Sequence, residues 1–167
     1  SERMSDGDIV RVKAISGCYR WRNAVGEETD FLSADELENL TIRAGTLTQA
    51  ERQTINYHVS ATIKMLEQLP WPGHLKNVPE YAGGHHERMD GRGYPRGLKR
   101  EEMSWQARMM AIADIFEALT AGDRPYKDAM TLSQALDILD KFRHNGHIDP
   151  DLHDVFVNSE IYRKYAT

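Results

Sequence analysis

The chain has 167 residues, of which 40% are hydrophobic and 28% are charged, and its formal net charge is −5. This length and composition predict one soluble domain that is large enough to bury a core, and the acidic charge excludes a general surface for nucleic-acid polymers or anionic membranes. Because Cys18 is the only cysteine, an internal disulfide and a thiolate metal site are excluded, and no apolar run reaches the roughly 20 residues that span a bilayer.

Apolar residues recur at three- and four-residue steps along most of the chain, a pattern typical of amphipathic helices. Capping residues, prolines and glycines divide this pattern into helices expected over residues 7–22, 33–40, 48–69, 74–81, 104–119, 131–139 and 149 onward. Ser33 with Glu36 and Thr48 with Glu51 form two capping boxes at helix starts. No segment of four or more residues alternates as a half-buried strand does. The sequence therefore predicts an all-α fold, a bundle of about six to seven helices.

Two polar side chains lie alone within predicted helices. His58 comes one residue before Val59 and is either a hydrogen-bonded core residue or a metal ligand. Asp114 lies in the segment MMAIADIFEAL, so its carboxylate is expected to be at least partly buried. A buried charge needs a cation, a metal or hydrogen-bond donors. The structural alternative is an aspartate that is bonded to a backbone amide or to Arg124.

His85 and His86 follow two glycines at the end of a predicted helix. Because adjacent side chains on a helical turn point about 100° apart, the two imidazoles are not expected to meet one metal by default. Either they address two neighbouring ions, or one binds metal while the other contacts substrate. With His58 and Asp114 they form a nitrogen and oxygen ligand set that suits Fe, Mn or Zn better than Ca.

The loop after the two histidines is rich in glycine and in positive charge. Five basic residues crowd into this part of an acidic chain: Arg88, Arg92, Arg96, Lys99 and Arg100. Guanidinium groups match phosphate oxygens, and glycines let the backbone approach a ligand closely. Tyr94 could stack on a nucleobase. The alternative is a solvated loop of mixed charge, because acidic residues lie among and beside the basic ones.

Three motifs and their order resemble one family. HHERMDGRGYPRGLKREEM, ARMMAIADIFEALTAGDRPYKDAMTLSQALDIL and HIDPDL are similar to motifs of the HD-GYP family, a bacterial branch of the HD superfamily of metal-dependent phosphohydrolases. Similarity upstream through GTLTQAERQTINYHVSATIKML extends the resemblance over residues 44–157. It implies a helical HD-superfamily bundle with two or three metal ions, commonly iron or manganese rather than zinc. It also implies a cyclic dinucleotide substrate, cyclic di-GMP or a relative, which is hydrolysed to the linear dinucleotide or to GMP.

The resemblance assigns roles to nine positions of this chain. The metal ligands that it implies are His58, His85, His86 and Asp114. The substrate-side loop, which in the family also contacts diguanylate cyclase domains, matches Gly93, Tyr94 and Pro95. The positions expected near the phosphates are Arg124 and Lys127. A cyclic dinucleotide and diguanylate cyclase domains are therefore the expected partners.

One part of the family pattern is missing from this chain. In the family a His-Asp pair in an HD-x-G-K segment precedes the position of His58, but no histidine occurs before His58 here. Residues 1–43 are expected to be an N-terminal helical segment outside the family core, and residues 44–167 the C-terminal part of an HD-GYP-like domain. His153 and Asp154 are expected to be surface polar residues and not ligands.

Three functional hypotheses stay open at this point. In the first, the chain, which begins at Ser1, is part of a longer cytoplasmic phosphodiesterase that upstream domains can anchor to a membrane. The incomplete metal site then leaves this chain weak or inactive alone. In the second, it is a degenerate module that binds a cyclic dinucleotide or a diguanylate cyclase-type partner without hydrolysis. The third is a plain structural helical module, which the helix-embedded Asp114 and the paired histidines disfavour.

Overall fold

The computed structural model describes residues 3–121 and 130–164. Arg124 and Lys127, which the resemblance places near the phosphates, lie outside the described residues. The chain divides into two compact units, Ser1–Ile55 and Asn56–Thr167. Each unit is described by itself.

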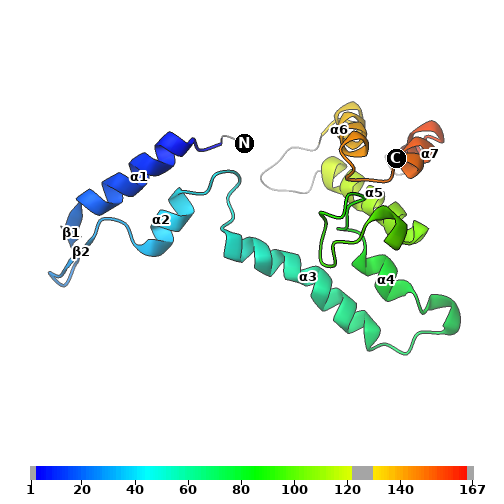
Figure 1. Cartoon of the computed structure of the whole chain (residues 1–167), viewed down its shortest axis with the longest axis horizontal. Helices are drawn as coiled ribbons and strands as arrows, with labels where there is room; N and C mark the ends of the chain where they lie inside the picture. Colours follow the sequence, from blue (N-terminus) through cyan, green and yellow to red (C-terminus); the bar gives the residue numbers. More distant parts are fainter. Residues whose placement is uncertain (1–2, 122–129, 165–167) are drawn as a thin grey trace. The chain divides into compact units, whose positions relative to one another are not determined.

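The first unit contains two α-helices and a small hairpin (Figure 1). Its elements, in chain order, are α1 (Asp6–Cys18), β1 (Arg20–Arg22), β2 (Glu28–Asp30), α2 (Ala34–Leu40) and the first turns of α3 (Gln49–Glu67). The capping box predicted for α2 is confirmed. The Glu36 carboxylate accepts from the Ser33 N–H (2.8 Å), and the Glu36 N–H donates to the Ser33 hydroxyl (3.2 Å).

The hairpin shows that the predicted helix over residues 7–22 was wrong at its end, since α1 ends at Cys18. β1 and β2 pair antiparallel directly after α1. Their turn is built by Asn23, whose side-chain oxygen accepts from the N–H groups of Val25 (3.1 Å) and Glu27 (2.9 Å), and by Gly26 at φ 87°. An asparagine that satisfies turn amides in this way competes with helix formation.

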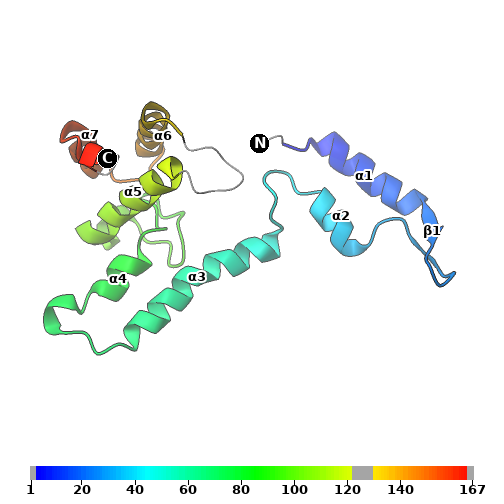
Figure 2. The same ribbon diagram turned by 180° about the vertical axis from the view of Figure 1, so that it is seen from behind.

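The second unit is helical (Figures 1 and 2). After the body of α3 come η1 (Gly73–Leu75), α4 (Val78–Gly83), η2 (Arg100–Glu102), α5 (Trp105–Thr120), α6 (Leu132–His144), α7 (Pro150–Asn158) and η3 (Ile161–Lys164). α6 and α7 pack against each other and against α5, and α5 also packs on α4. The described residues form seven α-helices and one two-stranded sheet, which confirms the predicted helical fold class.

Side-chain caps set where three of these helices begin. The predicted capping box of Thr48 and Glu51 opens α3, because the Glu51 carboxylate accepts from the Thr48 N–H (2.8 Å) and the Glu51 N–H donates to the Thr48 hydroxyl (3.2 Å). Thr131 caps α6 in the same way, and Asp149 caps α7 ahead of Pro150. Such a cap contributes about 1 kcal/mol to stability, so these boundaries follow from local sequence.

The core of the second unit lies where α5, α6 and α7 meet. Its buried side chains are Ile112, Phe116, Ala135, Leu139, Ile148 and Tyr162. Burial stabilises by about 1.5–3 kcal/mol for each large apolar side chain, so this core holds α5 firmly in place beside the site described below. In the described part of the chain, no helix is both long and apolar enough to cross a membrane.

Candidate metal centre

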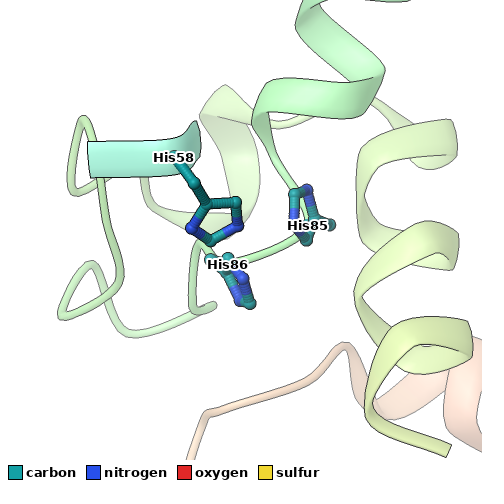
Figure 3. Close-up of side chains that lie close together, drawn as sticks. All are labelled: His58, His85 and His86. Atoms are coloured by element: carbon teal, nitrogen blue, oxygen red, sulfur yellow. The ribbon is translucent and has the colours of Figure 1, made fainter. Parts of the chain in front are cut away.

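Three histidines from two chain segments meet in the second unit (Figure 3). His58 comes from α3, and His85 and His86 come from the turn that follows α4. Each offers a ring nitrogen, and these nitrogens all lie within 4.8 Å of one another. The ring centroids are 4.2 Å apart for His85 and His86 and 5.3 Å apart for His58 and His86. Imidazole nitrogens grouped in this way suit a divalent transition metal.

The turn explains how two adjacent histidines reach one cluster. α4 ends at Gly83, so the histidines are no longer held at the helical angle that would separate their side chains. A Cβ placed on Gly83 would lie 2.6 Å from the Ile63 side chain of α3, and one placed on Gly84 would lie 2.6 Å from the Ala107 Cβ of α5. The two glycines therefore let the turn lie tightly against α3 and α5, which brings the histidine pair to the histidine of α3.

The protonation state of the cluster favours metal binding. Nδ1 of His85 lies within hydrogen-bond distance of the Ala82 carbonyl oxygen, which can only accept. In the neutral form of His85 this contact places the proton on Nδ1 and leaves the lone pair of Nε2 for a bond to metal. Burial lowers the pKa of His86, the neighbouring His85 ring lowers it further, and the Asp114 carboxylate opposes both in part. His86 is thus neutral at neutral pH, which is the form that binds a metal.

Asp114 lies outside this group of nitrogens and is exposed, so the expectation of a partly buried carboxylate was wrong. Of its apolar neighbours in sequence, Ile112 is buried in the core, and Met110 borders a cavity together with Asp114. Phe116 is buried in the core and also borders this cavity. The charge of Asp114 still interacts with the His86 ring of the cluster. It opposes the lowering of the His86 pKa by burial. Asp114 as a fourth ligand stays a prediction.

The Gly-Tyr-Pro segment lies directly on the histidine pair. The Tyr94 ring stacks on the His86 ring, with centroids 4.8 Å apart and an interplanar angle of 23°. The Tyr94 N–H donates to the His86 carbonyl oxygen (3.2 Å), and the peptide bond between Tyr94 and Pro95 is cis. Gly93 packs so closely that an added Cβ would lie 2.4 Å from the Glu87 Cα. The predicted substrate-side loop therefore borders the histidine cluster.

The five basic residues of this loop fall into two groups. Arg88 donates two hydrogen bonds to the Asp90 carboxylate (3.0 and 2.8 Å), and these hold the pKa of Asp90 down at about 2. Arg100 pairs with Asp149 (2.9 Å). The others are exposed and make no ion pair within residues 3–121 and 130–164: Arg92, Arg96 and Lys99. The mixed-charge alternative holds for the first group, and the second is available to an anionic ligand.

A cavity of about 580 Å³ opens beside the histidines. His85 and Asp114 contribute polar groups to its wall, and apolar side chains that include Met110, Phe156 and Ile161 form much of the rest. Its size and mostly apolar wall are typical of a small-molecule site. This cavity could not be predicted from the sequence, because its walls come from helices that are far apart along the chain.

Two polar residues are more buried than their sequence context predicts. His153, expected at the surface, is 5% exposed, and its Nε2 has no hydrogen-bond partner among the residues that the structure describes. It lies one helical turn after the buried cap residue Asp149 and so faces inward with it. Asp154 is half-buried and pairs with Arg143 (2.8 Å). Neither belongs to the histidine cluster.

Glu87, which was expected only as one of the charged residues of the loop, is 1% exposed.

Replacing Gly93 with alanine is expected to lower the free energy of unfolding by about 1–3 kcal/mol, the usual cost of overpacking. The added Cβ would lie 2.4 Å from both the Arg88 nitrogen and the Glu87 Cα, which are backbone atoms that cannot move aside alone. Urea denaturation followed by far-UV circular dichroism measures the loss. Gly73→Ala is the matched control, because no atom lies within 4 Å of a Cβ there. Equal stability of the two variants would contradict the close approach.

The chain is similar to known phosphodiesterases. A family model described as HD domain matches residues 34–152. The 3'3'-cGAMP-specific phosphodiesterase 3 of Vibrio cholerae is 39% identical over 144 residues, which cover 86% of this chain and 30% of the relative. A cyclic di-GMP phosphodiesterase of Pseudomonas aeruginosa is 36% identical over 117 residues, which cover 70% of this chain and 27% of the relative. A cyclic di-GMP phosphodiesterase of Thermotoga maritima is 30% identical over 132 residues, which cover 76% of this chain and 35% of the relative. The chain thus spans between 27% and 35% of the length of these relatives.

Proposed function

Because this chain belongs to the HD domain family and is of its HD-GYP type, we propose that it is part of a metal-dependent phosphodiesterase that hydrolyses a cyclic dinucleotide. One observation carries the proposal: three imidazole nitrogens lie within 4.8 Å of one another, and the Gly-Tyr-Pro loop stacks on one of the rings. The names of the relatives support cyclic di-GMP or 3'3'-cGAMP as the substrate. A cytoplasmic location and diguanylate cyclase domains as partners belong to the same proposal.

A divalent cation is assigned to His58, His85 and His86, with Asp114 as the proposed fourth ligand. The fit rests on the groups themselves, since Nε2 of His85 keeps its lone pair, His86 is neutral and the Asp114 charge reaches the cluster. Mixed nitrogen and oxygen donors suit iron or manganese, which are proposed ahead of zinc. When bound, the cation supplies a Lewis acid for the phosphoryl oxygens of the substrate.

Other residues of the chain bind and orient the substrate. Tyr94 keeps its proton, because burial and the charge of Asp114 raise its pKa, so its hydroxyl can donate to a phosphate oxygen. Gly93 and Pro95 shape the loop that carries it. The proposed phosphate contacts are Arg92, Arg96, Lys99, Arg124 and Lys127. In hydrolysis the oxygen of water bonds to phosphorus, the bond from phosphorus to the ribose oxygen breaks, and the leaving oxygen gains a proton.

Three nitrogens and one carboxylate are too few ligands for the two or three metal ions that the resemblance implies. We propose that a His-Asp pair outside this chain supplies the remaining ligands, so that residues 44–167 are the C-terminal part of the domain. This chain alone then turns substrate over slowly or not at all. The second candidate is a degenerate module that binds a cyclic dinucleotide or a diguanylate cyclase-type partner without hydrolysis. A full-length protein without an upstream His-Asp pair would select it.

The test uses this chain reconstituted with Mn²⁺ or Fe²⁺. We expect metal-dependent binding of cyclic di-GMP in calorimetry and slow release of the linear dinucleotide in chromatography. Asp114→Asn should weaken metal binding by more than about 100-fold, because it removes the charged carboxylate of the proposed fourth ligand. Asp137→Asn, an exposed position on α6, is the matched control and should retain both metal and dinucleotide.

Three outcomes separate the candidates. Binding together with metal-dependent hydrolysis supports the phosphodiesterase. Binding of cyclic di-GMP without any product, from this chain and from the full-length protein alike, selects the degenerate module. If the metal-loaded chain binds neither cyclic di-GMP nor 3'3'-cGAMP nor a diguanylate cyclase domain, both candidates are wrong.

A further inference from the structure

Glu87 is a buried carboxylate that follows directly after a histidine of the metal centre. Its side chain is 1% exposed, and it makes no ion pair with any residue that the structure describes. A carboxylate buried without a cation is costly unless hydrogen-bond donors replace the lost water. The donors here are two backbone N–H groups.

Both N–H groups come from the far end of the Gly-Tyr-Pro loop. The Arg96 N–H donates to Oε1 of Glu87 (2.7 Å), and the Leu98 N–H donates to Oε2 (2.9 Å). Each carboxylate oxygen thus serves one amide. Hydrogen bonds to a charged acceptor are roughly twice as strong as bonds between neutral groups, so this end of the loop is held firmly.

The near end of the loop is held by Glu87 and by its neighbour His86. The Tyr94 N–H donates to the His86 carbonyl oxygen (3.2 Å), and Gly93 lies against the backbone of Glu87. The loop therefore leaves the pair His86 and Glu87 and returns to it, with the Tyr94 ring stacked on the His86 ring.

The far end also places a cation near the site. A Cβ on Gly83 would lie 3.6 Å from a terminal nitrogen of the Arg96 guanidinium, and Gly83 precedes His85 by two positions. The Arg96 side chain is exposed and has no ion pair among the residues that the structure describes. The backbone bond from Arg96 to Glu87 thus helps to hold this guanidinium beside the histidine turn.

We propose that Glu87 is a positioning residue that holds Tyr94 and Arg96 against the metal centre and so determines the affinity for the cyclic dinucleotide. The proposal rests on the proposed function of the site. Glu87 itself is not assigned to the metal, because both of its oxygens accept loop N–H groups and it is not in the histidine group.

Glutamine is the informative replacement for Glu87. It has nearly the same shape, but its amide has only one oxygen, and its NH₂ group would face a second N–H donor. Glu87→Gln therefore loses one of the two loop bonds while the backbone contacts of Gly93 and Tyr94 stay in place. Glu101→Gln is the matched control, because Glu101 is an exposed glutamate of the same region.

The experiment compares these variants in the Mn²⁺-loaded chain. For Glu87→Gln we expect the wild-type Mn²⁺ stoichiometry, about tenfold weaker binding of cyclic di-GMP, and about tenfold faster amide exchange at Arg96 and Leu98. In the metal-free chain, the NMR signals of the His86 ring should also shift, because Tyr94 no longer stacks on it in one position. Glu101→Gln should leave all four measurements unchanged.

Each other outcome overturns the proposal. If metal and dinucleotide affinity fall together, Glu87 only supports the fold, and if dinucleotide affinity is unchanged, it positions nothing. Should Glu87→Gln fail to fold, Tyr94→Ala decides, since it keeps the carboxylate and should lose dinucleotide but not Mn²⁺. If the wild-type chain binds no dinucleotide, the proposed function fails. The exchange rates and the His86 signals then decide whether Glu87 holds the loop.

Discussion

Replacing His86 with alanine should abolish Mn²⁺ or Fe²⁺ binding by this chain. The His86 ring lies closer to His58 (5.3 Å) and to His85 (4.2 Å) than those two rings lie to each other (6.2 Å). Its removal takes away the ring that lies nearest to both of the others and leaves two of the three clustered nitrogens. Loss of a residue that only supports a metal ligand weakens metal binding by about 10–100-fold. Loss of His86, a ligand itself, should therefore weaken metal binding by more than about 100-fold. Calorimetry and metal analysis after dialysis measure the effect.

A second histidine variant provides the control for this experiment. His144 is exposed on α6, where its Nδ1 lies 2.8 Å from the Asp140 carbonyl oxygen, so His144→Ala should keep the wild-type metal content of about one ion per chain. Acidification should weaken binding in the wild type, because protons compete with metal for the imidazoles. Unchanged metal content in His86→Ala would show that the cluster is not the metal centre.

Local signals explain why the helices could be predicted from the sequence. The capping boxes of Ser33 with Glu36 and of Thr48 with Glu51 hold both partners within four residues, so short sequence segments contain the whole interaction. The hairpin after α1 could not be recognised in this way. Its strands have three residues each, which is too short for an alternating pattern to show, and its turn depends mainly on the side chain of Asn23.

The residues of the candidate site could be predicted better than their surroundings. The motif resemblance pointed to three histidines that lie in one cluster in the structure. The exposure of Asp114 could not be predicted, because apolar neighbours in sequence do not say which face of α5 meets the core and which meets a cavity. Glu87 was missed, because a glutamate among charged residues resembles a solvated side chain until the amides that it accepts are placed in space.

Asp149→Ala is expected to lower the free energy of unfolding by about 3–5 kcal/mol. The Asp149 side chain is fully buried and accepts from Arg108 (2.6 Å) and Arg100 (2.9 Å). Because Arg108 is itself only 8% exposed, alanine would leave a buried guanidinium without its partner and would also remove the cap of α7. A domain of this size has a total stability of about 5–15 kcal/mol, so the variant should lose a large part of it.

The same residue predicts how stability changes in acid. Burial acts to raise the pKa of Asp149, but hydrogen bonds from Arg100, from the Leu152 N–H and from Arg108 outweigh it, so the pKa in the folded protein lies below its ordinary value. In the unfolded chain the pKa is roughly 3.9. The stabilisation is therefore fully present above that pH and is lost as the pH falls through the folded-state pKa. Over this acidic window, stability should rise with pH less steeply in Asp149→Ala than in the wild type.

Urea denaturation at neutral and acidic pH tests both effects of Asp149. Asp151→Ala is the matched control, since Asp151 also pairs with Arg100 but its side chain is 69% exposed. An exposed pair contributes at most about 1 kcal/mol, so Asp151→Ala should remain close to the wild type. If the two variants lose equal stability, the buried ion pairs of Asp149 contribute nothing beyond an exposed pair. If the slope in acid is unchanged in Asp149→Ala, the pKa of Asp149 is not lowered by folding.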